Sequence, residues 1–284
     1  MRQIALVYKH GRPEAARLAE ELKMWLQREY GLTVDSQENV GRYSSTSDRC
    51  RISIPETADA VVVLGGDGTL LSVARVLEER LTPIIGVNLG ALGFLTQIQK
   101  EACYRDFKAI LDGGYECEER MRLDVSVMRE NVMTHRYRVL NDAVINKSAI
   151  ARIVGIKTAI AGRHLTHYRG DGLIIATPTG STAYNLSAGG PIVYPTAKTI
   201  ILTPICPFTL ANRPIILPSN VIIEVELSEH NKDVTLTCDG QVGCELTPSD
   251  KVLVSEADNP LRLIMTPSID YFEILRNKLN WGQD

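Results

Sequence analysis

The sequence predicts an α/β domain followed by a β-rich domain. In roughly the first hundred residues, short apolar runs alternate with segments whose apolar residues recur at helical spacing. Near residue 120 the pattern changes to strands with two-residue alternation and turn signals. The length of 284 residues suits about two domains. We therefore expect a Rossmann-like parallel sheet in residues 1–100, joined by the tail 266–284, and a β-rich domain in residues 101–265.

The first domain is expected to alternate strand and helix. Pro13 suits the first turn of a helix, and Gly31 is a typical helix stop. The apolar run ADAVVVL is typical of a strand buried on both faces. The expected elements are strand 4–8, helix 13–30, strand 60–64, helix 69–77 and strand 83–87. Such alternation favours a parallel sheet with helices on its faces.

The second domain is expected to be all-β or nearly so. A helix over 104–111 ends at Gly113-Gly114, and strands follow it. Residues 221–227 and 234–238 alternate apolar with polar side chains, as half-buried strands do. Asp239-Gly240 is a hairpin turn signal. The tail 271–281 again has helical spacing.

Composition narrows the classes of partner. The formal net charge is −3, so no excess of basic residues indicates a nucleic acid or a membrane surface. No segment approaches the roughly 20 apolar residues that span a bilayer, and the N-terminus does not resemble a signal peptide. The six cysteines are scattered, without zinc or redox spacing. We expect a cytoplasmic protein.

The turn Gly65-Gly66-Asp67-Gly68 follows a buried strand and precedes a helix. Open α/β sheets bind ligands at this place, and a helix N-terminus attracts phosphate. The turn is not a Walker A loop, since it lacks the Gly-Lys-Ser/Thr ending, and it is not a dinucleotide fingerprint, since Leu71 stands where the third glycine would be.

Asp67 would repel a phosphate, so its place in this turn needs an explanation. It could hold Mg²⁺, or it could accept a proton from an attacking hydroxyl while the glycine amides hold the donor phosphates. It could instead cap the helix that starts at Thr69. The sequence leaves these alternatives open.

Two further segments combine polar and small residues. Asn141-Asp142 interrupts an apolar alternation and could bind an adenine and a ribose, or could form a β-turn. Residues 168–191 place hydroxyls, glycines and Tyr184 after a short strand, which suits a loop wrapped around one ligand. A serine nucleophile is not indicated, because the segment has no G-x-S-x-G elbow. The segment from Gly90 to Thr96 by itself is only a weak indication of a functional site.

Taken together, these segments resemble the NAD kinase family. The resemblance is carried by GGDG at 65–68, NLGALGFLT at 88–96, LND at 140–142, DGLIIATPTGSTAYNLSAGGPI at 171–192, PFTLANRPI at 207–215 and CDGQ at 238–241. GGDG alone also resembles diacylglycerol kinases, sphingosine kinases and 6-phosphofructokinases. The long block at 171–192 separates the NAD kinases from these.

The resemblance implies an enzyme that moves the γ-phosphoryl group of ATP to the adenosine 2′-hydroxyl of NAD, making NADP, with Mg²⁺ or another divalent metal. Asp67 would be the general base. The implied NAD-binding residues are Asp67, Gly68, Asn141, Asp142, Arg152, Arg169, Asp171, Thr182, Ala183, Tyr184, Asn185, Leu186, Ser187 and Gln241. The implied phosphate-donor loop is Gly65, Gly66, Gly68 and Thr69. No metal ligand is assigned, and Ser72 supplies no basic group for the donor phosphates.

The family also implies a site between the two domains and a homodimer or homotetramer. Three other functions compete with this one. A kinase for a lipid or sugar hydroxyl would share only GGDG, and the 171–192 block argues against it. A non-catalytic NAD(H) sensor would not need Asp67. A dehydrogenase would need the missing G-x-G-x-x-G fingerprint.

Overall fold

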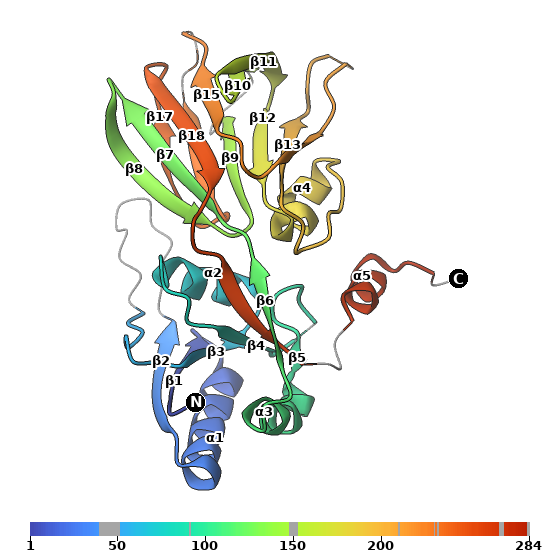
Figure 1. Cartoon of the computed structure of the whole chain (residues 1–284). Helices are drawn as coiled ribbons and strands as arrows, with labels where there is room; N and C mark the ends of the chain where they lie inside the picture. Colours follow the sequence, from blue (N-terminus) through green and yellow to red (C-terminus); the bar gives the residue numbers. More distant parts are fainter. Residues whose placement is uncertain are drawn as a thin grey trace. The chain divides into compact units, whose positions relative to one another are not determined.

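The computed structural model describes residues 1–39, 52–90, 92–147, 153–209, 211–229, 231, 233–266 and 270–282. These divide into two compact units (Figure 1). Unit 1 holds the described residues up to Glu119 and those from Leu261 onward, and unit 2 holds Arg120–Pro260. An α/β unit and a β-rich unit were predicted, and this fold class is confirmed.

Unit 1 is built on a seven-stranded sheet in the order β2-β1-β3-β4-β19-β6, with β5 paired to β4. The strands β1, β2, β3, β4, β5 and β19 pair with one another in parallel. Its strands are β1 (Gln3–Lys9), β2 (Thr33–Asn39), β3 (Ala60–Gly65), β4 (Ile84–Asn88), β5 (Ile98–Gln99), β6 (Glu116–Arg120) and β19 (Leu261–Met265). Its helices are α1 (Pro13–Tyr30), α2 (Asp67–Val76), α3 (Cys103–Leu111) and α5 (Tyr271–Leu279), with a 3₁₀ turn over Lys100–Ala102.

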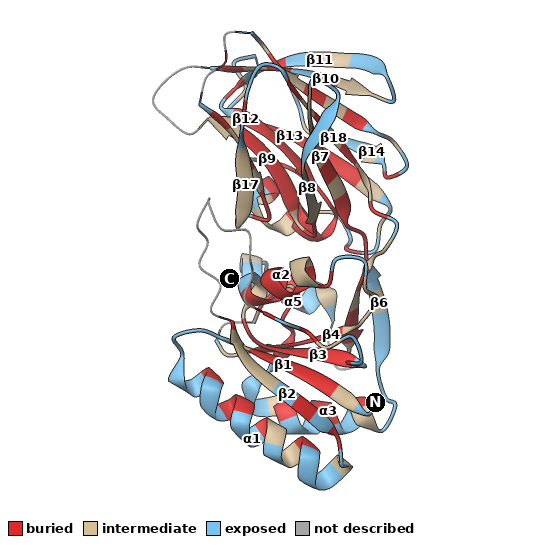
Figure 2. Cartoon of the chain, turned by 90° about the vertical axis from the view of Figure 1, so that its left-hand side faces the viewer, coloured by how far each residue is buried: buried red, intermediate tan, exposed pale blue. Residues whose placement is uncertain are grey.

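Helices lie on both faces of this sheet. Figure 2 shows α1 and α3 on one side and α2 on the other. The strand order reverses between β1 and β3, because α1 leads outward to β2 and α2 leads the other way to β4. Ligands of open α/β sheets bind at the carboxyl ends of the strands beside such a switch point. The Gly65–Gly68 turn leaves the carboxyl end of β3.

The two boundaries of unit 1 differ from the expected residues 100 and 266. The strand β6 belongs to this sheet, although its sequence ECEER shows no apolar alternation. Phe107 of α3 is fully buried in the core of unit 1. Leu263 of β19 pairs in parallel with Ile84 of β4. These pairings join segments far apart in the sequence, which local patterns do not reveal.

Unit 2 contains two antiparallel six-stranded sheets, ordered β11-β10-β15-β18-β7-β8 and β14-β13-β12-β9-β16-β17. The first comprises β7 (Leu123–Arg129), β8 (Val132–Val139), β10 (Val154–Ile160), β11 (Arg163–Gly170), β15 (Ile223–Leu227) and β18 (Asp250–Glu256). The second comprises β9 (Asp142–Lys147), β12 (Gly172–Ala176), β13 (Thr199–Ile205), β14 (Ile215–Pro218), β16 (Val234–Cys238) and β17 (Val242–Leu246).

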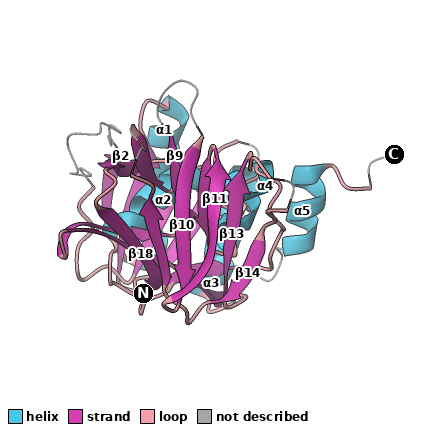
Figure 3. Cartoon of the chain, turned by 90° about the horizontal axis from the view of Figure 1, so that it is seen from above, coloured by secondary structure: helices cyan, strands magenta, loops and turns pink. Residues whose placement is uncertain are grey.

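The core of unit 2 lies between these sheets. Alternate residues such as Val125, Ile145 and Val252 point into it from both sheets. The outer face of the second sheet is covered as well, since Ile174 and Ile201 form a second cluster against Ala188 and Val193. Those two residues lie in the segment that carries the short helix α4 (Tyr184–Ser187), which Figures 1 and 3 show beside β13. This segment is therefore anchored to the sheet.

Within the part of the chain that the structure describes, no helix combines the length and the apolar character that crossing a bilayer requires.

Candidate active site

Asp67 is the first residue of α2, and Gly66 occupies the N-cap position without a side-chain cap. Of the alternatives that the sequence left open, capping is therefore not the role of Asp67. Its carboxylate turns instead to the segment after β4. Oδ1 accepts from the Leu95 N–H at 3.1 Å and from the N–H and hydroxyl of Thr96, each at 3.0 Å, and Oδ2 accepts from the Phe94 N–H at 2.9 Å.

This arrangement distinguishes the two carboxylate oxygens. A carboxylate offers about four lone-pair directions, two on each oxygen. Three donors crowd Oδ1, whereas Oδ2 accepts one hydrogen bond from the residues that the structure describes. Oδ2 is therefore the oxygen with room for a further proton donor. The segment 93–96, a weak signal in the sequence, is the partner that orients Asp67.

Gly93 makes this contact possible. A Cβ built on Gly93 would lie 2.1 Å from Asp67 Oδ1 and 2.6 Å from Thr96 Oγ1. Such distances are well below van der Waals contact. Only a residue without a side chain lets the carboxylate lie against this backbone.

In unit 2 the Asn141-Asp142 pair lies where three segments meet: the start of β9, the turn between β16 and β17, and the end of β12. We call this place the corner. Asn141 lies in a bend, and Asp142 is the first residue of β9. The Asp239 carboxylate accepts hydrogen bonds from the N–H groups of Leu140, Asn141 and Asp142. On the other side, the Thr177 N–H donates to the Asn141 carbonyl at 2.9 Å. The sequence suggested Asn141 and Asp142, but Asp239 and Thr177 were missed.

Asp142 is an unusual carboxylic acid. It is 4% exposed. Burial raises the pKa of the Asp142 carboxyl to about 7, and the negative charge of Asp239 adds to the rise. Asp142 therefore holds its proton up to neutral pH, where it presents a hydrogen-bond donor as well as an acceptor.

This pKa predicts a stability change with pH. The pKa of Asp142 in the folded state lies above the unfolded value of about 3.9. The protonated Asp142 side chain therefore contributes fully to the free energy of unfolding below about pH 4, and this contribution is lost as pH rises to about 7. The isosteric variant Asp142→Asn stays neutral. We expect it to be more stable than the natural protein by about 1–3 kcal/mol near pH 8, with the gain vanishing near pH 4.

Urea unfolding at both pH values measures this difference. The exposed residue Asp258 offers a matched control in the same unit, since Asp258→Asn should show no pH-dependent gain. A stability difference for Asp142→Asn that is the same at both pH values would contradict the protonated state of Asp142.

The segment after β12 forms a compact loop of a 3₁₀ turn (Thr179–Thr182) and α4. Gly180 packs against the corner, where an added Cβ would lie 2.1 Å from the Asn141 carbonyl oxygen. Asn185 is fully buried, donates to the carbonyls of Ser181 and Pro191 and accepts from the Thr203 hydroxyl. Its side-chain hydrogen bonds join the loop to itself and to Thr203 of β13, so Asn185 anchors the loop to the sheet. Tyr184, the first residue of α4, is accessible, at 44% exposure.

The other predicted residues of unit 2 lie at its surface. The guanidinium of Arg169 is 5.6 Å from the centre of the exposed Phe208 ring. Asp171 is exposed, and its carboxylate raises the pKa of the neighbouring Cys206 thiol. The Gln241 N–H closes the turn after β16 by donating to the Cys238 carbonyl at 3.0 Å. Arg152 lies outside the described residues.

The remaining residues of the predicted loop differ in exposure. Thr182, Ala183 and Leu186 are half-buried, and Ser187 is exposed. In unit 1, Gly68 is exposed and Thr69 is buried, with its side chain lying against Gly65. The Thr69 hydroxyl is thus shielded by the backbone of Gly65.

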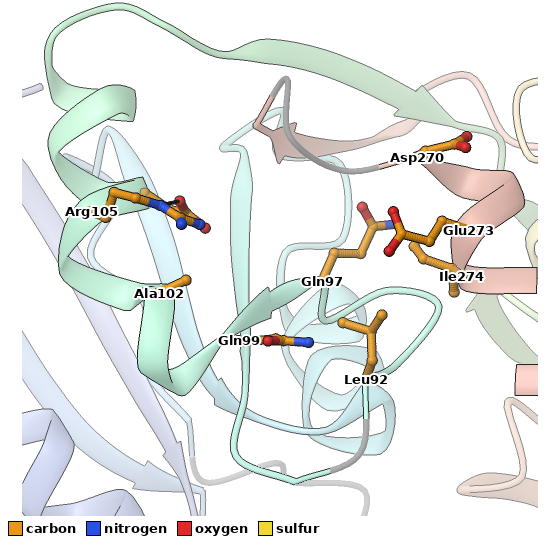
Figure 4. Close-up of a pocket in the computed structure, with 9 residues that line it drawn as sticks. Leu92, Gln97, Gln99, Ala102, Arg105, Asp270, Glu273 and Ile274 are labelled. Atoms are coloured by element: carbon orange, nitrogen blue, oxygen red, sulfur yellow. Dashed lines mark hydrogen bonds and ion pairs between the residues drawn. The ribbon is translucent and has the colours of Figure 1, made fainter. Parts of the chain in front are cut away.

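A separate hollow in unit 1 lies between the segment 92–106 and α5 (Figure 4). Its labelled lining residues are Leu92, Gln97, Gln99, Ala102, Arg105, Asp270, Glu273 and Ile274. None of the predicted substrate residues lines it, so the predicted site is not this hollow. Among the described residues, no three His, Cys, Asp or Glu side chains gather in a group that could hold a metal ion.

Comparison with known proteins identifies relatives over the full chain. A family model described as the ATP-NAD kinase N-terminal domain matches residues 4–115, and one described as the C-terminal domain matches residues 140–266. The chain is 62% identical over 283 residues to an NAD kinase of Syntrophobacter fumaroxidans and 48% identical over 284 residues to one of Geotalea daltonii, each covering 100% of both chains.

Solved structures agree with these relatives. The chain is similar to yeast NADH kinase complexed with NADH, with a TM-score of 0.88 and 25% identity over 100% of this chain and 89% of that one. It is also similar to an NAD kinase from Archaeoglobus fulgidus in complex with ATP, with a TM-score of 0.76 and 26% identity over 98% of each chain.

Proposed function

Because this chain belongs to the NAD kinase family, we propose that it transfers the γ-phosphoryl group of ATP to the adenosine 2′-hydroxyl of NAD to make NADP. The observation that carries the proposal is the carboxylate of Asp67, held by the 94–96 segment at the carboxyl end of a buried strand with Oδ2 open to a further donor.

The role of Asp67 follows from the acidity of the acceptor. A ribose hydroxyl does not ionise at neutral pH, so its proton must leave as the new oxygen–phosphorus bond forms. Asp67 Oδ2 would accept that proton as a general base. Such help is typically worth about 10²–10⁴-fold in rate, or about 3–5 kcal/mol of the barrier. The rest of the acceleration comes from alignment of the reactants and neutralisation of the γ-phosphate.

The donor triphosphate would bind at the Gly65–Thr69 turn. The N–H groups of Gly66 and Gly68 lie at the N-terminus of α2, where the helix dipole favours negative charge. Mg²⁺ or another divalent metal would arrive with ATP as part of the substrate. Mg²⁺ is commonly bound this way, through phosphates and few protein carboxylates.

The acceptor would contact the residues that the family resemblance implies. Gly68 lies beside the base, and Asn141 and Asp142 would hold the adenosine part, with the neutral Asp142 able to donate a hydrogen bond. Tyr184 and Ser187 are the exposed members of the loop 182–187. Arg169, Asp171 and Gln241, together with Arg152, would contact the remainder of the dinucleotide.

We expect purified protein to form NADP when incubated with NAD, ATP and Mg²⁺. A dehydrogenase specific for NADP measures the product, and parallel reactions replace NAD by NADH, replace ATP by polyphosphate, or omit the donor. NADH is included because of the similar yeast NADH kinase. If no 2′-phosphorylated dinucleotide formed with any donor, the proposed function would be wrong.

Two properties of the intact enzyme are proposed on the family resemblance. We expect a homodimer or homotetramer in the cytoplasm. Light scattering coupled to gel filtration gives the mass of the assembly, and a mass of 31.4 kDa would instead indicate a monomer.

A further inference from the structure

Asp239 is a turn residue whose side chain is buried. It lies in the reversal between β16 and β17, with φ +51, followed by Gly240 with φ +63. Positive φ at two consecutive residues is typical of a type I′ hairpin turn, for which Asp-Gly is a preferred pair. The turn alone therefore explains the sequence. It does not explain the side chain, because turn side chains lie at the surface and Asp239 is 8% exposed.

The buried carboxylate is used to bind the backbone of another strand. Asp239 Oδ1 accepts from the N–H of Leu140 at 3.1 Å, of Asn141 at 2.7 Å and of Asp142 at 3.3 Å, and Oδ2 also accepts from Leu140 at 3.1 Å. The Asp239 N–H returns a bond to the Asp142 carbonyl at 2.9 Å. Three consecutive N–H groups directed at one carboxylate offset much of the cost of burying its charge.

The carbonyl side of the same corner is held by Thr177. Its hydroxyl donates to the Leu140 carbonyl at 2.5 Å and its N–H to the Asn141 carbonyl at 2.9 Å. The Thr177 hydroxyl also accepts from the Gly180 N–H at 3.0 Å. The backbone that carries Asn141 and Asp142 is thus fixed from opposite sides, by Asp239 through its amides and by Thr177 through its carbonyls.

We propose that Asp239 is a positioning residue of the dinucleotide site, whose carboxylate fixes the Leu140–Asp142 backbone so that Asn141 and Asp142 meet the substrate in one orientation. This rests on the proposed function of that corner. Asp239 touches no reacting atom, so its loss should weaken substrate binding more than it slows the chemical step. A loose corner must be ordered when the substrate binds, which lowers affinity.

The test compares two variants that both tolerate positive φ. Asp239→Gly keeps the turn and removes the carboxylate, whereas Asp239→Asn keeps the turn and an oxygen at the Oδ1 position, where most of the bonds are made. We expect KM for NAD to rise at least about tenfold in the glycine variant and about threefold in the asparagine variant, with kcat changing by less than about threefold in both.

Asp233 supplies a matched control. It is an exposed aspartate with φ +57 at the opposite end of β16, and it contributes to no predicted site. Asp233→Gly and Asp233→Asn should both keep the natural KM. Hydrogen–deuterium exchange provides a measurement that needs no turnover: the N–H groups of Leu140, Asn141 and Asp142 should exchange faster in Asp239→Gly, and remain protected in Asp239→Asn.

The outcomes separate this inference from the proposed function. If the natural protein makes NADP but Asp239→Gly keeps its KM and its amide protection, the positioning role is wrong and Asp239 is a turn residue only. If the natural protein makes no NADP, the function fails, while exchange still tests whether the carboxylate holds the corner. If the glycine variant does not fold, the asparagine variant decides: an unchanged KM would overturn the proposal.

Discussion

Replacing Asp67 by asparagine should lower kcat by about 10²–10⁴-fold while leaving KM for NAD within about threefold. An amide cannot accept the proton of the 2′-hydroxyl. Its oxygen can still occupy the Oδ1 position and keep the three bonds from Leu95 and Thr96, while the bond from the Phe94 N–H to Oδ2 is lost. With three of the four bonds kept, the segment 93–96 should stay in place. Steady-state kinetics with saturating ATP, combined with NAD binding by calorimetry, separates the two effects.

Asp112→Asn is the matched control for this variant, because Asp112 is an exposed acid of unit 1 at the end of α3. This variant should have the same kcat and the same KM for NAD as the natural protein. Near-normal turnover of Asp67→Asn would remove Asp67 from the role of base. A loss of NAD binding equal to the loss of turnover would instead indicate that Asp67 mainly binds substrate.

Replacing Gly93 by alanine should have the second largest effect, because the added methyl group would collide with the carboxylate of Asp67. The Cβ would lie 2.1 Å from Asp67 Oδ1 and 2.8 Å from its Cγ, so the carboxylate or the segment must move. Displacement by about 1 Å can cost about 10²-fold in rate. We therefore expect kcat to fall by about 10–100-fold, with a loss of about 1–3 kcal/mol of stability from overpacking.

Gly90→Ala is the control in the same segment. The nearest atom to a Cβ on Gly90 is Asn88 Oδ1 at 3.9 Å, an ordinary contact, so this variant should keep both activity and stability. Kinetics and urea unfolding of the two variants measure the difference. Equal activity of Gly93→Ala and Gly90→Ala would mean that the contact between Gly93 and Asp67 is not needed for turnover.

The elements with strong local patterns could be predicted from the sequence. Helix α1 begins at Pro13 and is closed by Gly31 with φ +63, as expected from the residue types. The strands β3 and β16 were also predicted, because β3 is apolar throughout and β16 alternates apolar with polar residues. The strand β2, with the sequence TVDSQEN, was not predicted, because a polar edge strand shows its identity only through its pairing with β1.

The site residues divide in the same way. Asp67, Asn141 and Asp142 stand out because a carboxylate among glycines or a polar pair in an apolar run needs an explanation. The residues that hold them do not stand out. Gly93, Thr177 and Asp239 belong to residue types that loops and turns contain everywhere. Asn185, which is predicted to contact the substrate, is buried and hydrogen-bonded to its own loop and to Thr203 of β13, which its neighbours in the sequence could not show.

By itself, the sequence determined the class of fold, the order of its main elements, the family, and which side chains are chemically able to act. Only the tertiary structure decided which oxygen of Asp67 has fewer hydrogen-bond donors, that the pKa of Asp142 is raised, and that Asp239 accepts hydrogen bonds from the backbone beside it. The physical reason is that acidity and orientation depend on burial and on hydrogen-bond donors from distant segments. The 27 positions between Asp67 and Phe94, and the 98 between Asn141 and Asp239, are bridged only when the chain folds.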